Sequence, residues 1–224
     1  MAAMTAHDYD RHVERALGPD RLDRYLRACS DDVTAALRLY EWNCAVSSAL
    51  FEVLGDVEVV VRQALHRELS EWHQSKGFPG EWYDNAHGLL MPSAVADIAK
   101  ARQRLMRKRA TISPAGVIAE LPFGFWRYLM TRPYSSTIWP IVSKGAFPHV
   151  PGSGYQKLWA RVARLHTLRN LIAHHEPIFW RKIQRDMNDC MLTLRGVSKE
   201  AEHWSRSRTQ FEVLITLQPE HGSV

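Results

Sequence analysis

Residues 165–180 read LHTLRNLIAHHEPIFW, and the eight residues from Arg169 to Glu176 include a cation, an amide, two imidazoles and a carboxylate. The first half of this stretch continues an amphipathic helical pattern, in which apolar residues recur every three or four positions. Pro177 clashes with the carbonyl four residues earlier and disfavours helical geometry at Glu176. We therefore expect the helix to end between Ala173 and Glu176, where the polar side chains are concentrated.

Arg169 falls on the apolar face of this predicted helix, on the same side as Leu165 and Ile172. A guanidinium keeps its charge, so in such a place it needs a carboxylate partner or must face a cleft. Glu58 lies in the same way within an apolar stripe of its own predicted helix, and we expect it to pair with Arg169. The alternative is a local pair between Glu58 and Arg62, which are four residues apart.

His174 and His175 fall on other faces of a continuing helix, but the expected helix end leaves them able to turn. An imidazole has an ordinary pKa near 6.5 and can take or give a proton at neutral pH, and an arginine can neutralise a phosphate. With Arg169 and Asn170, these side chains suit metal-independent cleavage of RNA, in which the 2′-hydroxyl attacks the neighbouring phosphorus.

Two other interpretations of the histidines stay open. One is structural, because an imidazolium stabilises the negative end of a helix dipole. The other is metal binding, which the sequence disfavours because adjacent histidines normally point apart and no cysteine lies near them.

The rest of the chain predicts a mainly helical protein with one domain over residues 1–224. We expect N-terminal helices over residues 5–74, a central region over 75–154, and the motif helix with C-terminal helices over 155–224. The proline-free segment from Val33 to Gln74 predicts one long helix. Phe123 to Trp126 predicts an aromatic core cluster, with a base-stacking platform as the alternative.

Two segments are expected to be non-helical. Four prolines and three glycines between Arg132 and Gly154 predict a long loop. The apolar run from Phe211 to Leu217 predicts a strand or a packed extended tail.

The densest basic run lies on a helix predicted from Pro92 to Ala110. Such a run is typical of a solvated helix face, and the alternative is contact with the phosphate backbone of RNA. The candidate RNA contacts are Lys100, Arg104, Arg107 and Lys108. A net charge of +5 and a pI near 9.2 permit nucleic-acid binding without requiring it.

Composition indicates the cellular compartment in which we expect the protein. No run reaches the roughly 18 apolar residues that a membrane span needs, and the first residues carry Asp8 and Asp10 in place of a basic and then apolar signal. We therefore expect a cytoplasmic protein with no membrane contact. Three scattered cysteines are too few for a disulfide framework or a cysteine metal site, and no cofactor or metal is expected.

The run from Arg169 to Ile178 resembles the signature of the Abi-like bacteriophage-resistance proteins, the AbiD and AbiF group, a branch of the HEPN superfamily. The resemblance extends to residues 40–43 (Tyr-Glu-Trp-Asn), 58–62 and 121–126 (Leu-Pro-Phe-Gly-Phe-Trp). Two positions depart from it: Gln63 stands where an asparagine is expected, and Leu171 stands where arginine is frequent.

This resemblance implies an HEPN-like helical bundle with additional helices and a metal-independent endoribonuclease that acts in phage defence or as a toxin. It implies a catalytic set of Arg169, Asn170 and His174 or His175 that meets across a homodimer, with Glu58, Arg62 and Glu176 in support. RNA is then the substrate, and an RNA or protein antitoxin is a further expected partner. The alternative function is a non-catalytic helical dimer that binds RNA or an antitoxin.

Overall fold

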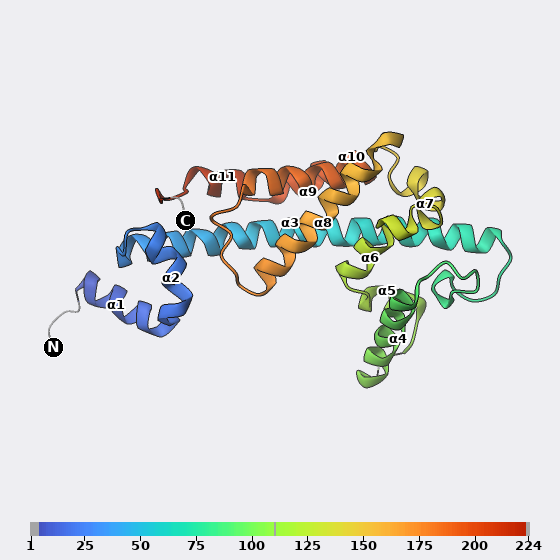
Figure 1. Cartoon of the computed structure of the whole chain (residues 1–224), viewed down its shortest axis with the longest axis horizontal. Coiled ribbons are helices and arrows are strands. Elements are labelled where there is room, and N and C mark those ends of the chain that lie inside the picture. The colour runs from blue at the N-terminus through green and yellow to red at the C-terminus, as the bar shows by residue number, and fades with distance from the viewer. Residues whose placement is uncertain (1–4, 110, 223–224) are drawn as a thin grey trace. The chain divides into compact units, whose positions relative to one another are not determined.

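A computed structural model describes residues 5–109 and 111–222 (Figure 1). Within these ranges the chain forms helices and no strands, which confirms the mainly α class. The principal helices are α1 (Ala6–Leu17), α2 (Pro19–Ala28), α3 (Val33–Ser75), α4 (Pro92–Arg107), α5 (Pro114–Glu120), α6 (Phe123–Leu129), α7 (Ile138–Ala146), α8 (Tyr155–Ala173), α9 (Ile183–Val197), α10 (Lys199–Arg208) and α11 (Phe211–Thr216). Cys29, Cys44 and Cys190, which all lie within these ranges, form no disulfide bond with one another.

The chain divides into two compact units, each built from separate segments. The first takes its described residues from 1–53, 168–187 and 208–224, and the second comprises the described part of 54–167 and 188–207. Helices α3, α8 and α9 contribute residues to both units, and so does α10 through its last residue, Arg208. The prediction of a single domain over the whole chain stays a prediction.

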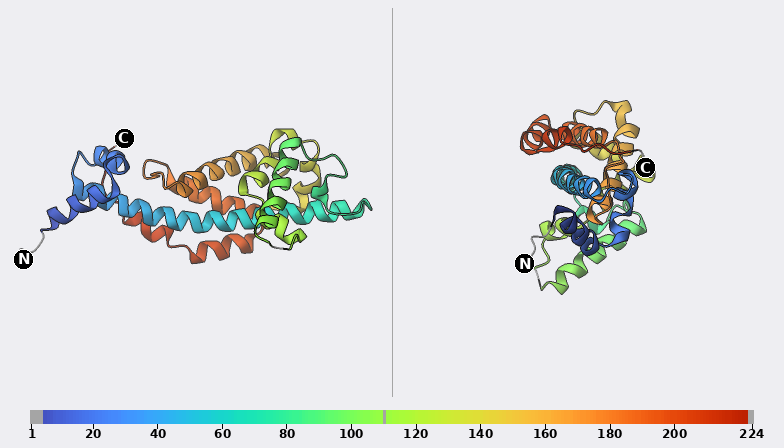
Figure 2. Two further views of the ribbon diagram at one scale, coloured as in Figure 1. Left: turned by 90° about the horizontal axis from the view of Figure 1, so that it is seen from below. Right: turned by 90° about the vertical axis from the view of Figure 1, so that its left-hand side faces the viewer.

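The first unit closes around aromatic side chains. Tyr25 of α2, Phe179 and Phe211 are buried, and the rings of Tyr25 and Phe179 lie 5.0 Å apart. The indole N–H of Trp42 donates to the carbonyl of Leu214 (2.7 Å). The last described residue lies beside the end of α2 (Figure 2), where the N–H of Gly222 donates to the carbonyl of Ala28 (2.8 Å). The C-terminal segment is therefore part of the first unit's core.

The second unit is organised by the later half of α3. Leu54, Val61 and Leu65 are buried in the expected stripe. The aromatic cluster of α6 is buried as well, and its Trp126 ring lies 5.1 Å from that of Phe125 in an edge-to-face arrangement. This confirms the core interpretation of the cluster. Figure 2 shows α4 to α7 gathered around this part of α3.

The long predicted helix is confirmed, since α3 spans Val33–Ser75. Helix α4 begins at Pro92 as predicted and ends at Arg107, whereas Ala110, its predicted end, lies outside the described residues. Among the helices that the structure describes, none combines the length and the apolar content needed to cross a membrane.

The predicted long loop from Arg132 to Gly154 is wrong, because it contains α7. Pro140 is the third residue of this helix, where its missing N–H removes no intrahelical hydrogen bond. Ile138, Val142 and Ala146 recur every four residues and are buried, so one apolar face holds the helix in place.

The predicted strand or extended tail from Phe211 to Leu217 is also wrong, because Phe211–Thr216 form α11. Its apolar residues do not share one buried face: Phe211 is fully buried, whereas Val213 and Leu217 are 64% and 63% exposed. An apolar run this short does not distinguish a strand from a helical turn.

We predict a pH dependence of stability from His66 in the second unit. Its Nδ1 accepts a hydrogen bond from the indole N–H of Trp82 (3.0 Å), which requires that nitrogen to be unprotonated. Burial lowers the pKa of His66 below its ordinary value. The unfolded chain then binds the proton more readily, so the free energy of unfolding should fall as the pH drops below about 6.5, by at most about 1.4 kcal/mol per pH unit for this proton.

Urea denaturation at several pH values measures this dependence. His66→Gln should reduce it, and His203→Gln, at an exposed position of α10, serves as the matched control. Equal pH dependence in His66→Gln and the wild type would contradict the prediction.

Candidate functional site

Helix α8 ends at Ala173, within the predicted range. The N–H of Glu176 donates to the carbonyl of Leu171 (2.8 Å), and the N–H of His175 donates to that of Ile172 (2.9 Å), which is the Schellman pattern. His175 adopts a left-handed φ of 57° at the position where this motif usually has glycine. The helix end that the sequence predicts is therefore confirmed, and it holds His175 in an unfavourable backbone conformation.

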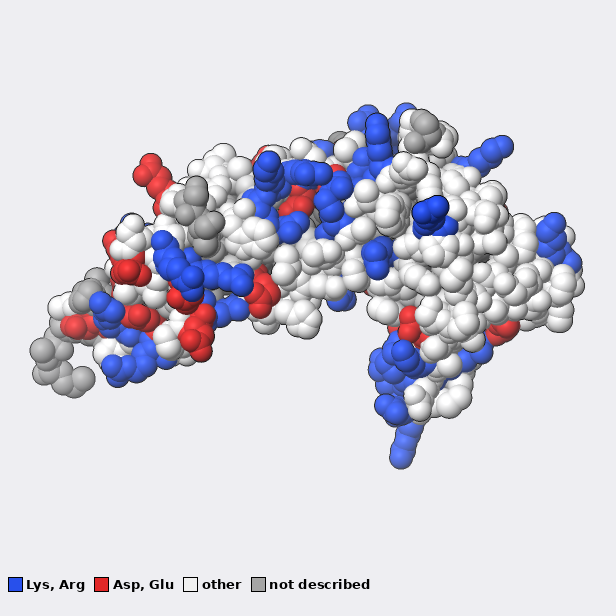
Figure 3. Space-filling model, in the orientation of Figure 1, with Lys and Arg blue, Asp and Glu red and all other residues white. Residues whose placement is uncertain are grey.

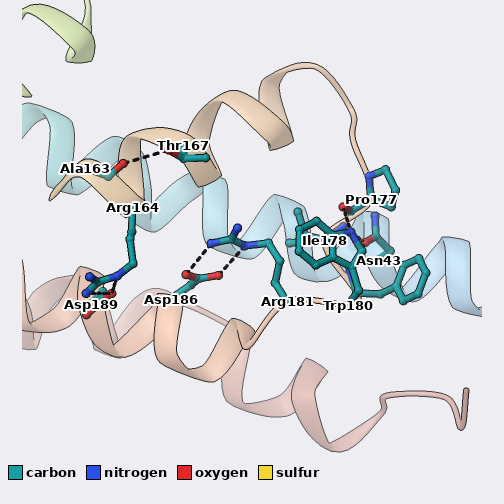
Figure 4. Close-up of polar contacts among 11 residues, drawn as sticks. Asn43, Ala163, Arg164, Thr167, Pro177, Ile178, Trp180, Arg181, Asp186 and Asp189 are labelled. Atoms are coloured by element: carbon teal, nitrogen blue, oxygen red, sulfur yellow. Dashed lines mark hydrogen bonds and ion pairs between the residues drawn. The ribbon is translucent and has the colours of Figure 1, made fainter. Parts of the chain in front are cut away.

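Asn43 of α3 fixes the chain that follows this helix end (Figure 4). Its side-chain oxygen accepts hydrogen bonds from the N–H groups of Ile178 (2.8 Å) and Phe179 (3.0 Å), and the residue is only 4% exposed. The indole N–H of Trp180 donates to the carbonyl of Pro177 (3.0 Å). Two buried backbone donors thus depend on one amide, because a buried N–H without an acceptor is costly.

A buried ion pair holds the start of α9. The guanidinium of Arg181 donates to both carboxylate oxygens of Asp186, each at 2.9 Å, and the Asp186 side chain is 5% exposed (Figure 4). Two parallel hydrogen bonds of this kind fix orientation as well as distance. The turn between α8 and α9 is therefore held at both of its ends.

The first unit contains a pocket of about 910 Å³ beside this helix end. The ends of α1 and α8, the start of α2 and one face of α3 line it. The face of α3 contributes Tyr40, Asn43, Cys44, Ser47, Ser48 and Phe51, which recur about once per helical turn. The pocket therefore combines aromatic surface with hydroxyl and amide groups.

The structure brings three of the predicted site residues to this pocket: His174, His175 and Glu176. Both histidines are exposed, and the Glu176 carboxylate lies 3.8 Å from the guanidinium of Arg24. A further cation, Arg21, lines the pocket and lies over the ring of Tyr40 at 5.9 Å. Two imidazoles, a carboxylate and a guanidinium thus share one pocket, and this set can exchange protons and neutralise an anion.

Arg169 and Asn170 are not among the described residues that line the pocket. Both lie near the end of α8 and are half-buried. The backbone carbonyl of Asn170 accepts from the N–H of His174 (3.0 Å), which links Asn170 to the helix end. The lining of this pocket therefore includes the histidine part of the predicted catalytic set, and Arg169 is not among its lining residues.

The supporting residues Glu58 and Arg62 belong to the second unit. Both are half-buried, and the Nε of Arg62 is buried without a hydrogen-bond partner in the part of the chain that the structure describes. The expected pairing of Glu58, with Arg169 or with Arg62, stays a prediction.

The basic residues of α4 are partly taken up by ion pairs. Lys100 pairs with an aspartate on the preceding turn (3.2 Å), and Arg104 and Lys108 both pair with Glu120. Hydrogen bonds from Lys108 and Arg104 lower the pKa of Glu120 below its ordinary value. Arg107 is exposed, and Figure 3 shows Lys and Arg along the projecting α4 region. These ion pairs fit a solvated helix face, and contact with RNA stays a prediction.

Most of the pocket residues were not singled out from the sequence as site residues, among them Arg21, Tyr40, Ser47, Ser48 and Phe51. One signal was available, because polar residues recur along one face of the otherwise apolar first half of α3. Nothing in the sequence pattern shows that this face lies against the end of α8. Within the described ranges, no group of three or more His, Cys, Asp and Glu side chains is placed to hold a metal ion.

Comparisons of the chain with protein-family models, with curated proteins and with solved structures found no match. The resemblance to the Abi-like proteins therefore depends on the sequence run around Arg169 and its accompanying motifs, and it stays a prediction.

We predict that His175→Gly stabilises the protein. Glycine adopts the left-handed conformation of residue 175 without steric cost, so the free energy of unfolding should rise by about 0.5–1 kcal/mol in urea denaturation. The neighbouring His174 has no left-handed φ, so His174→Gly is the matched control and should be destabilising. A loss of stability in His175→Gly as large as that in the control would contradict the prediction.

Proposed function

We propose that this protein is an endoribonuclease of the Abi-like HEPN type, which cuts RNA in phage defence or as a toxin. The observation that carries the proposal is the placement of His174 and His175 together at the end of α8, in a pocket with a cation and hydroxyl groups. The resemblance of the surrounding run to the Abi-like signature points to the same chemistry. The proposed substrate is RNA, and the proposed compartment is the cytoplasm.

The proposed reaction uses one general base, one general acid and one cation. A histidine removes the proton of the 2′-hydroxyl, the oxygen attacks the neighbouring phosphorus, and the bond from phosphorus to the 5′-oxygen breaks. The leaving oxygen takes a proton from the acid, which gives a 2′,3′-cyclic phosphate and a 5′-hydroxyl. An arginine stabilises the charge that builds up on the phosphorane oxygens. His174 and His175 are the proposed acid and base, without assignment of either role.

In this proposal, Arg169 acts in the catalytic site of a second copy of the chain. It does not line the pocket that holds the histidines of its own unit, so an arginine from a partner molecule is the simplest way to complete the set. In a homodimer with two-fold symmetry, each chain supplies Arg169 and Asn170 to one site and histidines to the other. An RNA or protein antitoxin is the proposed regulator of such an enzyme.

The competing function is a helical dimer that binds RNA or an antitoxin without cleaving RNA. It predicts RNA binding that survives changes to the histidines. The aromatic and hydroxyl groups of the pocket suit binding as well as catalysis, so cleavage itself is the measurement that distinguishes the two functions.

We predict that the purified full-length protein cleaves RNA in the presence of EDTA and leaves 2′,3′-cyclic phosphate ends. Replacing the general acid or base should lower the rate by about 100- to 10,000-fold, so at least one of His174→Ala and His175→Ala should show this loss. Arg169→Ala should lower it by about 100-fold or more. Initial rates on a labelled single-stranded RNA measure these effects.

Two controls accompany this measurement. His203→Ala changes an exposed histidine of α10 and should cleave as the wild type does, and an RNA with 2′-deoxyribose at the cleaved position should stay intact. Absence of cleavage by the wild type, or equal cleavage by all the variants, would refute the enzyme and favour the binding module.

A further inference from the structure

The second unit contains a separate pocket of about 230 Å³, formed by the first turns of α8, the end of α9 and the segment that precedes α8. Its lining includes Lys157, Arg161, Arg195 and His149, and among the described residues that line it there is no aspartate or glutamate. Figure 3 shows Lys and Arg side chains gathered over the region of α8 and α9. The pocket thus has a strongly positive wall.

The wall of this pocket is held in place by close backbone packing. Lys157 and Arg161 are one helical turn apart on α8, so they project from the same face. The N–H of His149 donates to the carbonyl of Gly196 (3.2 Å), which ties the segment before α8 to the end of α9. A Cβ added at Gly196 would lie 2.9 Å from the Val150 side chain, so a larger residue at this position would require that side chain to move.

The positive charge here exceeds what the neighbouring carboxylates neutralise. Arg161 and Arg164 share the single carboxylate of Asp189, with Nε–Oδ1 and Nη2–Oδ2 distances of 3.4 Å and 2.7 Å. Figure 4 shows the pair of Arg164 and Asp189. Arg195 lies 4.0 Å from Glu202, and Glu202 makes a shorter ion pair of 2.9 Å with Arg206 on its own helix. Each carboxylate is therefore divided between two arginines.

Arg161 is the most constrained of these cations. Its side chain is 17% exposed, and its buried Nε lies 3.4 Å from Asp189 Oδ1, which is long for a hydrogen bond. Burial lowers the pKa of Arg161 from its ordinary value, Asp189 opposes this change, and Arg164 adds to it. Because a guanidinium stays protonated in proteins, an additional anion beside Arg161 would relieve an unfavourable arrangement.

The remaining titratable group on the wall is His149, which faces the pocket from the segment before α8. Hydrogen bonds from its own backbone N–H and from the Ser198 hydroxyl lower the pKa of the Glu200 carboxyl. The nearby charges of His149 and Lys199 lower this pKa further. Three carboxylates lie around the pocket, those of Asp189, Glu200 and Glu202. They are outnumbered by the lysine and arginine side chains there, which are Lys157, Arg161, Arg164, Arg195, Lys199 and Arg206.

We propose that this pocket binds a phosphate group, carried either by a mononucleotide or by the end of an RNA strand. Guanidinium and ammonium donors converging from two helices match the tetrahedral oxygens and negative charge of phosphate. The pocket is large enough for one such group and lies in the second unit, whereas the histidine pocket lies in the first. Phosphate binding at this site does not require RNA cleavage. The proposed phosphate site and the proposed enzyme activity can therefore be tested independently.

Isothermal titration of the full-length protein with inorganic phosphate tests this proposal. We expect saturable binding within about 10 mM phosphate, and we expect Lys157→Gln and Arg195→Gln each to weaken it by about tenfold, since each removes one charge-assisted contact. Both positions are exposed, so these variants should fold. The matched control is Lys144→Gln, which removes an equal charge from an exposed position of α7.

Absence of saturable phosphate binding by the wild type would overturn the proposal. Equal affinity in the wild type and in both pocket variants would do so as well, and so would an equally large loss in Lys144→Gln. Thermal unfolding of each variant verifies that it is folded before titration.

Two further arms identify the source of the phosphate. Adenosine 5′-monophosphate is compared with adenosine, and a 2′-O-methyl oligonucleotide with a 5′-phosphate is compared with the same strand ending in a hydroxyl. A preference for the phosphorylated member of the first pair supports a mononucleotide, and a preference in the second pair supports an RNA end. No preference in either pair would contradict recognition of phosphate.

Discussion

The end of α8 is the constraint on which the candidate site depends. Pro177 prevents the helix from continuing, and the chain turns through the left-handed His175 into a segment that Asn43 holds by two backbone hydrogen bonds. If the helix continued, His174 and His175 would lie on different faces of it. The turn instead places both at one pocket.

The first half of α3 provides the opposite wall of this pocket. One face of the helix is apolar and buried in the core of the first unit, through residues such as Leu39, Val46 and Leu50. Another face presents Tyr40 and Ser47 to the pocket. Asn43 belongs to both parts, because it lines the pocket and accepts from the turn after α8. The buried amide of Asn43 therefore both holds the segment after α8 and forms part of the pocket lining.

The sequence predicted those elements whose causes are local. The end of α8 follows from Pro177, and the length of α3 follows from the absence of proline over that segment. Helix α7 was missed because Pro140 was counted as a helix breaker, although a proline in the first turn of a helix is tolerated. Helix α11 was missed because an apolar run of seven residues fits a strand equally well.

The histidines of the candidate site were predicted, whereas most of the pocket around them was not. His174 and His175 stand out as a dense polar run, but Arg21, Ser47 and Phe51 become site residues only when separate helices pack together. The lining of the pocket of about 230 Å³ in the second unit could not be predicted from the sequence for the same reason. Lys157 and Arg161 share one helix, while Arg195 joins them only through the fold.

The most direct test of the composite site is complementation between two inactive variants. Arg169→Ala and the double variant His174→Ala, His175→Ala are co-expressed with different tags and purified through both, so that each dimer contains one chain of each kind. A site built from two chains predicts that one of the two sites is intact, with about half of the wild-type rate of RNA cleavage. An inactive mixed dimer, alongside an active wild type prepared in the same way, would contradict the account.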